Sequence, residues 1–181
     1  MTTPTLDDIH RMISYDPLTG EFKWKVYRTF RAVIGGIAGT AHHTGYTRIK
    51  ILGKQFLAHR LAWLMQYGEL PSDEIDHIDQ DKSNNRIANL RSVSRSQNEA
   101  NKPGREWNQL RKKGVKVAPS GRARAVITVH RKTIPLGTFD TIDEAAHAYN
   151  KAALEHFGDC AVLNPIGTDY IDAAIAAKAA S

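Results

Sequence analysis

The chain has 181 residues, 41% of them hydrophobic, which is enough for one ordinary domain or two small ones. It contains no run of about 18 apolar residues, and its N-terminus carries acids where a secretory signal carries an apolar segment, so we expect neither a membrane span nor a signal. A single cysteine, Cys160, excludes an internal disulfide and a zinc site built on several thiolates, and it fits a reducing cytoplasm.

The formal net charge of +6 is unevenly distributed along the chain. Residues 101–132 hold ten basic side chains and one acidic side chain, whereas residues 69–81 hold six acidic side chains and no Lys or Arg. A solvated surface does not usually need such segregation. The pattern indicates a cation site in the acidic segment and a phosphate-binding surface in the basic one.

Three segments of the N-terminal half have clear patterns. Residues 15–26 have a Pro/Gly turn followed by a hydrophobic alternation, which predicts a turn and a strand. Residues 46–58 have two alternating segments on either side of Gly53-Lys54, which predict two strands joined by a turn. Residues 59–68 have apolar residues at helical spacing and end at a glycine, which predicts a helix. An acidic loop follows, and Ser94 or Ser96 caps the next predicted helix, residues 94–101.

In the C-terminal half, residues 114–139 predict three short strands with turns at Pro119-Gly121 and His130-Lys132. Residues 141–158 predict an amphipathic helix that begins with a capping box and ends at a glycine. Along the middle strand, arginines alternate with small apolar residues, so one face of the sheet is expected to pack on this helix and the other to carry arginines to solvent. A basic cluster that precedes the strands favours DNA as the partner of that face; it consists of Arg111, Lys112, Lys113 and Lys116.

Three interpretations compete for the acidic loop at residues 76–90. Asp79, Asp81 and Ser83 alternate as the oxygen ligands of an EF-hand do, but the Gly and Glu that this motif needs are absent, so the calcium-loop interpretation fails. The second interpretation is a polar loop whose Asn and Asp residues make turns, with an exposed His77. The third is a nuclease site with one metal ion, because histidine suits the activation of water and Asp and Asn oxygens suit Mg²⁺. The spacing of Asp-His, Asn-Asn-Arg, Asn-Leu-Arg and a further Asn favours the third.

Together with AHRLAW upstream, the segment IDHIDQDKSNNRIANLRSVSRSQN resembles HNH endonucleases of the phage and intron-homing type, over roughly residues 15–101. The resemblance implies a ββα-metal fold that holds one divalent ion. It makes His77 the general base, and it makes Asn89 the residue that fixes the loop and orients the backbone of the histidine. It makes Asp76 and Asn98 the metal ligands. Many members have histidine where Asn98 stands, and an amide oxygen there indicates Mg²⁺ or Mn²⁺.

Other positions near this site carry less specific signals. His59 in HRLAW either supports the site or packs against the loop, and Asp79 is a candidate to orient the base. Arg60, Arg86 and Arg91 either contact phosphates or pair with the local acids.

Residues 114–165 resemble the AP2 DNA-binding domain. The resemblance rests on Gly114-Val115-Lys116, Gly121-Arg122, Leu136-Gly137-Thr138-Phe139, Glu144-Ala145-Ala146, Ala148-Tyr149, Ala161 and Leu163-Asn164. It implies a three-stranded antiparallel sheet that lies in the major groove and is backed by one helix. The base-contacting positions of that family fall on Lys116, Arg122 and Arg124, with Arg131 and Lys132 on the next hairpin. Plant members have Trp where this chain has Ala123, so the target sequence cannot be carried over.

The sequence therefore predicts an α+β protein with two small domains. The predicted boundaries are a ββα-metal nuclease domain at 1–101, a basic linker at 102–113, an AP2-like domain of three strands packed on one helix at 114–165, and an alanine-rich tail at 166–181. We expect a metal-dependent endonuclease that acts on double-stranded DNA with one Mg²⁺ or Mn²⁺. The alternative is a sequence-specific DNA-binding regulator whose nuclease half is inert, and an RNA-directed enzyme is a weaker one.

The combination of the two modules looks like a homing endonuclease of a phage or mobile element. Such a protein is expected in the cytoplasm of a bacterial host cell, with no membrane partner. One centre of this type acts on one strand at a time, so a monomer that nicks DNA is the simplest expectation.

Overall fold

The computed structural model describes residues 4–27, 29, 33–102, 110 and 112–167. The chain divides into two compact units, Met1–Val93 and Ser94–Ser181. Most of the predicted linker and of the alanine-rich tail lies outside the described residues. Among the helices that the structure describes, none is long and apolar enough to cross a membrane.

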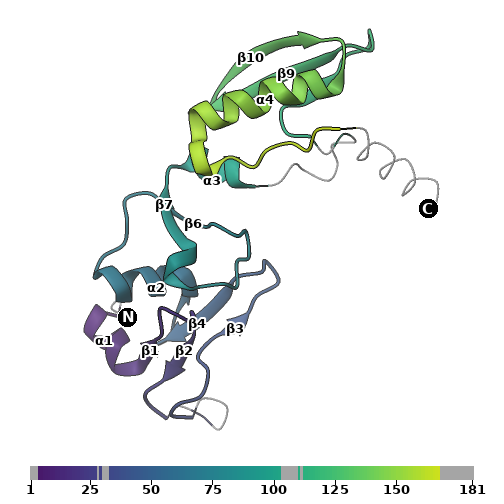
Figure 1. Ribbon diagram of the computed structural model, residues 1–181. Coiled ribbons are helices and arrows are strands. Elements are labelled where there is room, and N and C mark those ends of the chain that lie inside the picture. The colour runs from purple at the N-terminus through teal and green to yellow at the C-terminus, as the bar shows by residue number, and fades with distance from the viewer. Residues whose placement is uncertain (1–3, 28, 30–32, 103–109, 111, 168–181) are drawn as a thin grey trace, which may run out of the picture. The chain divides into compact units, whose positions relative to one another are not determined.

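The first unit combines small antiparallel sheets with short helices (Figure 1). In its described residues the strand orders are β1-β2, β3-β4-β5 and β6-β7. The elements are α1 (Leu6–Met12), β1 (Ile13–Tyr15), β2 (Phe22–Trp24), β3 (Thr40–Ala41), β4 (Thr47–Ile51), β5 (Lys54–Leu57), α2 (Ala58–Tyr67), β6 (Glu74–His77), the 3₁₀ turn η1 (Ile87–Asn89) and β7 (Leu90–Val93).

The core of the first unit gathers apolar side chains from its helices and from β1, β2, β4, β5, β6 and β7. Its most deeply buried members are Ile9, Ile13, Phe22, Ala38, Ile49, Ile51, Ala58, Leu61 and Ala62. Neither α1 nor β1 is among the predicted elements. The sequence does contain a signal for the start of α1, the pair Thr5 and Asp8. These residues form a capping box in which each side chain accepts a hydrogen bond from the other residue's backbone N–H.

The predicted strand pair at 46–58 is confirmed as β4 and β5, but its turn lies one residue earlier than predicted. Ile51 pairs with Lys54, and the turn residues are Leu52 (φ 46°) and Gly53 (φ 86°). A two-residue hairpin turn with both residues at positive φ matches the twist of the strands, which explains this register. The helix that follows, α2, ends as predicted at Gly68, which adopts the left-handed conformation.

The strands that flank the acidic loop, β6 and β7, form an antiparallel pair. Asp76 lies opposite Arg91, and His77 lies opposite Leu90. Helix α3 (Arg95–Asn101) follows β7 along the chain, so the elements of the predicted ββα segment are present in that order. Ser94 caps α3 through a capping box with Gln97, which resolves the two predicted caps in favour of Ser94.

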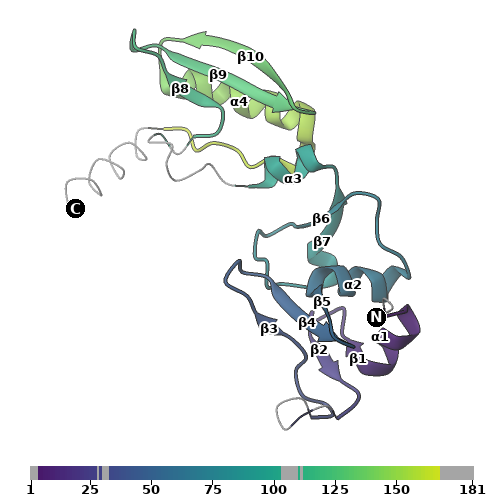
Figure 2. The same ribbon diagram turned by 180° about the vertical axis from the view of Figure 1, so that it is seen from behind.

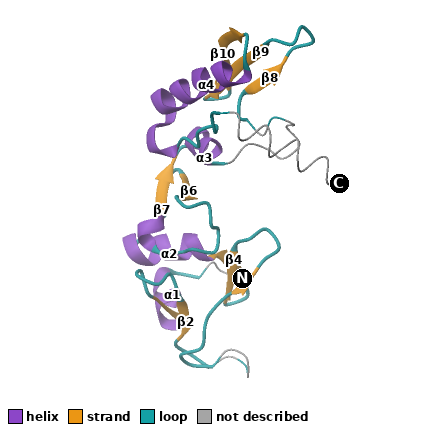
Figure 3. Ribbon diagram, turned by 45° about the vertical axis from the view of Figure 1, so that its right-hand side comes forward, coloured by secondary structure: helices purple, strands orange, loops and turns teal. Residues whose placement is uncertain are grey.

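The second unit begins with α3, so it starts before the predicted boundary after residue 101. Its other elements are β8 (Val115–Val117), β9 (Ala123–Val129), β10 (Lys132–Phe139), α4 (Ile142–Phe157) and the 3₁₀ turn η2 (Gly158–Cys160). The three strands form an antiparallel sheet in the order β10-β9-β8, and α4 lies along one face of it (Figures 2 and 3). The predicted sheet and the predicted helix are therefore present.

The two faces of this sheet are divided as the alternation predicts. Ala123, Ala125 and Ile127 are buried on the side of α4, whereas Arg124 and Thr128 are exposed. The buried side chains of the helix are mostly small; they include Ala145, Ala146, Ala152 and Ala153, together with the rings of Tyr149 and Phe157.

Gly114 is required where the chain enters the sheet. It has φ 67°, and a Cβ at this position would overlap the carbonyl oxygen of Val126 and the ring of Tyr149. The close approach of β8 to α4 therefore depends on a residue without a side chain.

Candidate functional site

The last two residues of β6, Asp76 and His77, are both buried, with 7% and 4% of their surface exposed. Successive strand residues point to opposite faces of a sheet, so the two side chains point in different directions from the end of the same strand. Each of them has its own set of neighbours in the first unit.

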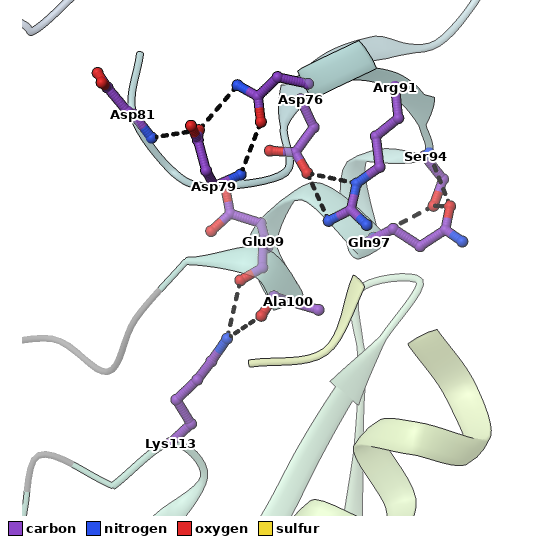
Figure 4. A network of polar contacts seen from close by, with 10 residues as sticks. Asp76, Asp79, Asp81, Arg91, Ser94, Gln97, Glu99, Ala100 and Lys113 are labelled. Atoms are coloured by element: carbon purple, nitrogen blue, oxygen red, sulfur yellow. Dashed lines mark hydrogen bonds and ion pairs between the residues drawn. The ribbon is translucent and has the colours of Figure 1, made fainter. Parts of the chain in front are cut away.

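Asp76 pairs with Arg91, its register partner on β7 (Figure 4). The Nε and Nη2 groups of Arg91 each donate a hydrogen bond of 3.0 Å to Oδ2 of Asp76. The side chains are only 8% and 18% exposed, so this charge-assisted interaction is largely screened from water. The sequence left open whether Arg91 contacts phosphate or pairs with an acid, and the structure pairs it with Asp76.

The His77 ring lies among other rings. The centroid of the His59 ring, from α2, lies 5.1 Å away in an edge-on arrangement, and that of Tyr46 lies 6.0 Å away. Burial lowers the pKa of His77, although a hydrogen bond with Asn85 and the charges of the nearby aspartates act in the opposite direction. The imidazole is therefore neutral at pH 7 and is able to accept a proton.

His59 belongs to the same group of rings. Its Nδ1 has no hydrogen-bond partner among the described residues, and burial, followed by the charges of His77 and Arg60, lowers its pKa to about 3. It therefore stays neutral near pH 7. The ring of His59 packs beside the ring of His77, and its supporting role at the site stays a prediction.

Asn89 connects the two ends of the acidic loop. Its Oδ1 accepts a hydrogen bond from the backbone N–H of Asp79 (3.1 Å), while its Nδ2 donates to Oδ1 of Asp79 and to the carbonyl of Asn84, both at 2.9 Å. Its own carbonyl accepts from the N–H of Ile78, the residue after His77 (2.9 Å). These contacts fix the backbone next to His77. Whether Asn89 is essential for catalysis stays a prediction.

Asp79 is engaged inside the loop. Its carboxylate accepts a hydrogen bond from the backbone N–H of Asp81 (2.9 Å; Figure 4). It also accepts from Nδ2 of Asn84 (2.6 Å) and from Nδ2 of Asn89 (2.9 Å). Burial raises the pKa of Asp79, but these hydrogen bonds outweigh burial and lower it. Its negative charge acts on His77 and raises the pKa of the histidine. Arg86, the remaining supporting candidate, is exposed at the start of η1.

Asn98, the second predicted metal ligand, is half-buried on α3. This helix belongs to the second unit, whereas Asp76 belongs to the first. The pairing of these two residues around a metal ion therefore stays a prediction. In the described part of the chain, no three His, Cys, Asp or Glu side chains gather into a group that would hold a metal.

The exposed face of the C-terminal sheet carries like charges side by side. Lys116 on β8 and Arg124 on β9 are direct register partners, and both are exposed. Like charges directly opposite each other on neighbouring strands repel, so this arrangement is favoured where an anion binds. The other predicted contact residues, Arg122, Arg131 and Lys132, are also exposed. Arg122 forms a surface ion pair with Asp140 (3.0 Å).

Two members of the basic cluster before this sheet, Lys112 and Lys113, do not lie on the solvated surface that the charge pattern suggests. Lys112 is 2% exposed; its Nζ donates to Oδ1 of Asp143 (2.8 Å) and to the carbonyl of Pro165 (2.6 Å). Lys113 is half-buried, and its Nζ donates to the backbone carbonyl of Ala100 (2.6 Å). Arg111 lies outside the described residues. These two lysines therefore have structural partners, and charge counting missed this because it does not distinguish a buried ammonium from an exposed one.

Three comparisons relate this chain to known proteins. A family model described as "HNH endonuclease" matches residues 56–100. "Uncharacterized HNH endonuclease L560" of Acanthamoeba polyphaga mimivirus is 32% identical over 145 residues, which cover 80% of this chain and 72% of that protein. A solved structure, "DNA binding and cleavage by the HNH homing endonuclease I-HmuI", has 22% sequence identity and a TM-score of 0.41, over 87% of this chain and 84% of that one.

Proposed function

This chain belongs to the HNH endonuclease family, and we propose that it is a metal-dependent endonuclease that hydrolyses phosphodiester bonds in double-stranded DNA. The observation that supports this best is that a neutral, buried His77 directly follows the carboxylate of Asp76 at the end of β6. Asn89 fixes the loop beside them. A general base, a carboxylate that is able to hold a divalent cation and a loop with a fixed conformation are what this proposal requires of the protein.

In this proposal His77 is the general base. Burial disfavours the imidazolium, so the ring is neutral and accepts the proton of the attacking water. The hydrogen bonds of Asn89 to Asp79 and to Asn84 hold the loop in one conformation, and the orientation of the ring follows from the backbone that they fix.

HNH nucleases generally use a divalent metal ion, and the proposed ligands fit one. Asp76 offers a carboxylate and Asn98 an amide oxygen; both are hard oxygen donors of the kind that Mg²⁺ and Mn²⁺ prefer. Such an ion, when bound, supplies positive charge to the scissile phosphate and to the leaving oxygen. An ion held by Asp76 would also offset the negative charge of the acidic segment, which repels the phosphates of DNA when no cation is bound.

The proposal predicts that cleavage depends on a divalent metal. Supercoiled plasmid incubated with the protein should be nicked in Mg²⁺ or Mn²⁺ and should stay intact in EDTA. Asp76→Asn, which removes the charge but keeps the shape, should need more metal for the same rate. Cleavage that continues in EDTA would exclude this mechanism. Tight duplex binding without cleavage in any metal would favour the regulator instead.

We also propose that the second unit binds duplex DNA through the exposed face of its sheet, in the manner of an AP2 domain. The adjacent, exposed charges of Lys116 and Arg124 support this, as does the helix that covers the opposite face. Together with the nuclease site, the sheet supports a homing endonuclease of a phage or mobile element. In this proposal it acts as a monomer in the cytoplasm of a bacterial host and nicks one strand.

Replacing Arg124 with alanine is expected to weaken duplex binding and to lower the slope of log affinity against log salt by about 1, because about one phosphate contact is lost. Binding is measured by fluorescence anisotropy at several salt concentrations. Lys151→Ala serves as the control, since Lys151 is exposed on α4, the helix that covers the other face. Equal slopes for the wild type and Arg124→Ala would show that this face does not bind DNA.

A further inference from the structure

A groove with a volume of about 570 Å³ lies in the second unit, between α3 and the turn that joins β9 to β10. The residues that line it come from both elements and include Arg95, Ser96, Glu99, Thr128, His130 and Arg131. The volume lies within the range of about 300–1,000 Å³ that is common for ligand sites, so the groove has room for a phosphate group and the sugars beside it.

The groove has an excess of positive charge. Arg95 and Arg131 are exposed, and neither guanidinium forms an ion pair with any of the residues that the structure describes. Glu99 is the acid in the lining, and its carboxylate forms an ion pair with Lys102 (2.5 Å). Two arginine side chains are therefore available to an anion from outside the protein.

The turn that carries Arg131 has an uncommon backbone conformation. His130 and Arg131 are its two central residues, with φ of 47° and 65°. Turns of this type favour Asn and Gly, because positive φ is unfavourable for most side chains. The turn is held to α3 by a hydrogen bond of 3.0 Å from the N–H of His130 to Oγ of Ser96. Strained backbone is found mostly where the side chains serve a function, and both of these side chains line the groove.

The groove continues the exposed face of the C-terminal sheet. Thr128 lines the groove, and it lies on the same face of β9 as Arg124, because the two residues are separated by an even number of positions along the strand. Arg124 lies opposite Lys116 on β8. Basic side chains therefore extend from the face of the sheet to α3.

We propose that this groove binds a backbone phosphate of the DNA duplex that the sheet binds, with Arg95 and Arg131 as the contacting residues. An arginine donates two parallel hydrogen bonds to phosphate oxygens, and the hydroxyl of Ser96 keeps its own hydrogen as a further donor. The inference rests on the proposed binding of DNA by the sheet. It adds a contact that positions the duplex without reading its sequence, and part of that contact comes from α3.

Replacing Arg95 with glutamine in the full chain tests this contact. Duplex affinity is measured by fluorescence anisotropy at several salt concentrations, on several duplexes of unrelated sequence. Arg95→Gln should lower the slope of log affinity against log salt by about 1 and should weaken binding to every duplex by the same factor, because one phosphate contact is lost. Arg95→Gln combined with Arg131→Gln should lower the slope by about 2.

Two controls separate this contact from a general effect of charge. Lys151→Gln removes one positive charge from the exposed side of α4 and should keep the wild-type slope. Arg95→Lys keeps the charge at the groove and should also keep the slope.

The outcomes distinguish the groove from the sheet. If Arg95→Gln kept the wild-type slope while Arg124→Ala lowered it, the inference would be wrong and the binding of DNA by the sheet would stand. A loss of affinity for only some of the duplexes would show a base contact and would overturn the inference as well. A wild-type protein that does not bind duplex DNA would overturn the proposed role of the sheet, and the inference with it.

Discussion

Replacing His77 with alanine is expected to slow DNA cleavage by about 10²–10⁴-fold, the range that a positioned general base contributes. The imidazole is buried, and its lowered pKa keeps it neutral, so it is the group at the end of β6 that is able to take a proton from water near pH 7. Duplex affinity should stay unchanged, because the proposed DNA-binding residues lie in the second unit. The rate is measured as nicking of supercoiled plasmid at saturating Mn²⁺.

Two controls make the His77 result specific. His43→Ala removes a histidine that is exposed in the turn after β3 and should cleave as the wild type does. Added imidazole should restore part of the activity of His77→Ala, because the cavity left by the ring is adjacent to the water that it activates. A variant that remains folded and cleaves at the wild-type rate would contradict the role of His77 and would favour a base elsewhere.

Local signals in the sequence account for much of the fold. The caps of α3 and α4 are set by side chains three residues apart, Ser94 with Gln97 and Thr141 with Glu144, so a short window of sequence contains both partners. The alternation along β9 is equally local, because it depends only on which residues follow one another. The loop contacts of Asn89 also lie within ten residues of one another.

Contacts with backbone groups far along the chain could not be predicted. Lys113 meets the carbonyls of α3 and the side chain of Asn164, and a carbonyl has no sequence signature because every residue has one. The burial of Lys112 depends on Asp143, 31 residues away. The sequence offers Arg91 as a partner for the local acids, but it does not give the register of β6 and β7. That register places Asp76 opposite Arg91, and it is known only from the structure.

Replacing Arg91 with methionine is expected to lower the free energy of unfolding by about 3 kcal/mol, the lower end of the range for breaking a buried ion pair. The reason is that the buried Asp76 carboxylate loses the guanidinium that donates both 3.0 Å hydrogen bonds. Urea denaturation measures the difference. The matched control is Arg11→Met, because the Arg11–Asp8 pair is exposed and such pairs contribute little. A double variant, Asp76→Asn with Arg91→Met, should regain most of the lost stability, since it leaves no buried charge.

The Arg91→Met variant also tests whether Asp76 holds the metal. A divalent cation and the Arg91 guanidinium are both positive groups drawn to one carboxylate, so Mn²⁺ should stabilise Arg91→Met more than it stabilises the wild type. A ligand at 100 times its Kd stabilises a protein by about 2.7 kcal/mol, which is enough to offset most of the loss. The Asp76→Asn variant should not be stabilised by Mn²⁺, because it lacks the carboxylate. If Mn²⁺ stabilised all three proteins equally, the ion would bind away from Asp76, and β6 would have to contribute to catalysis through His77 alone.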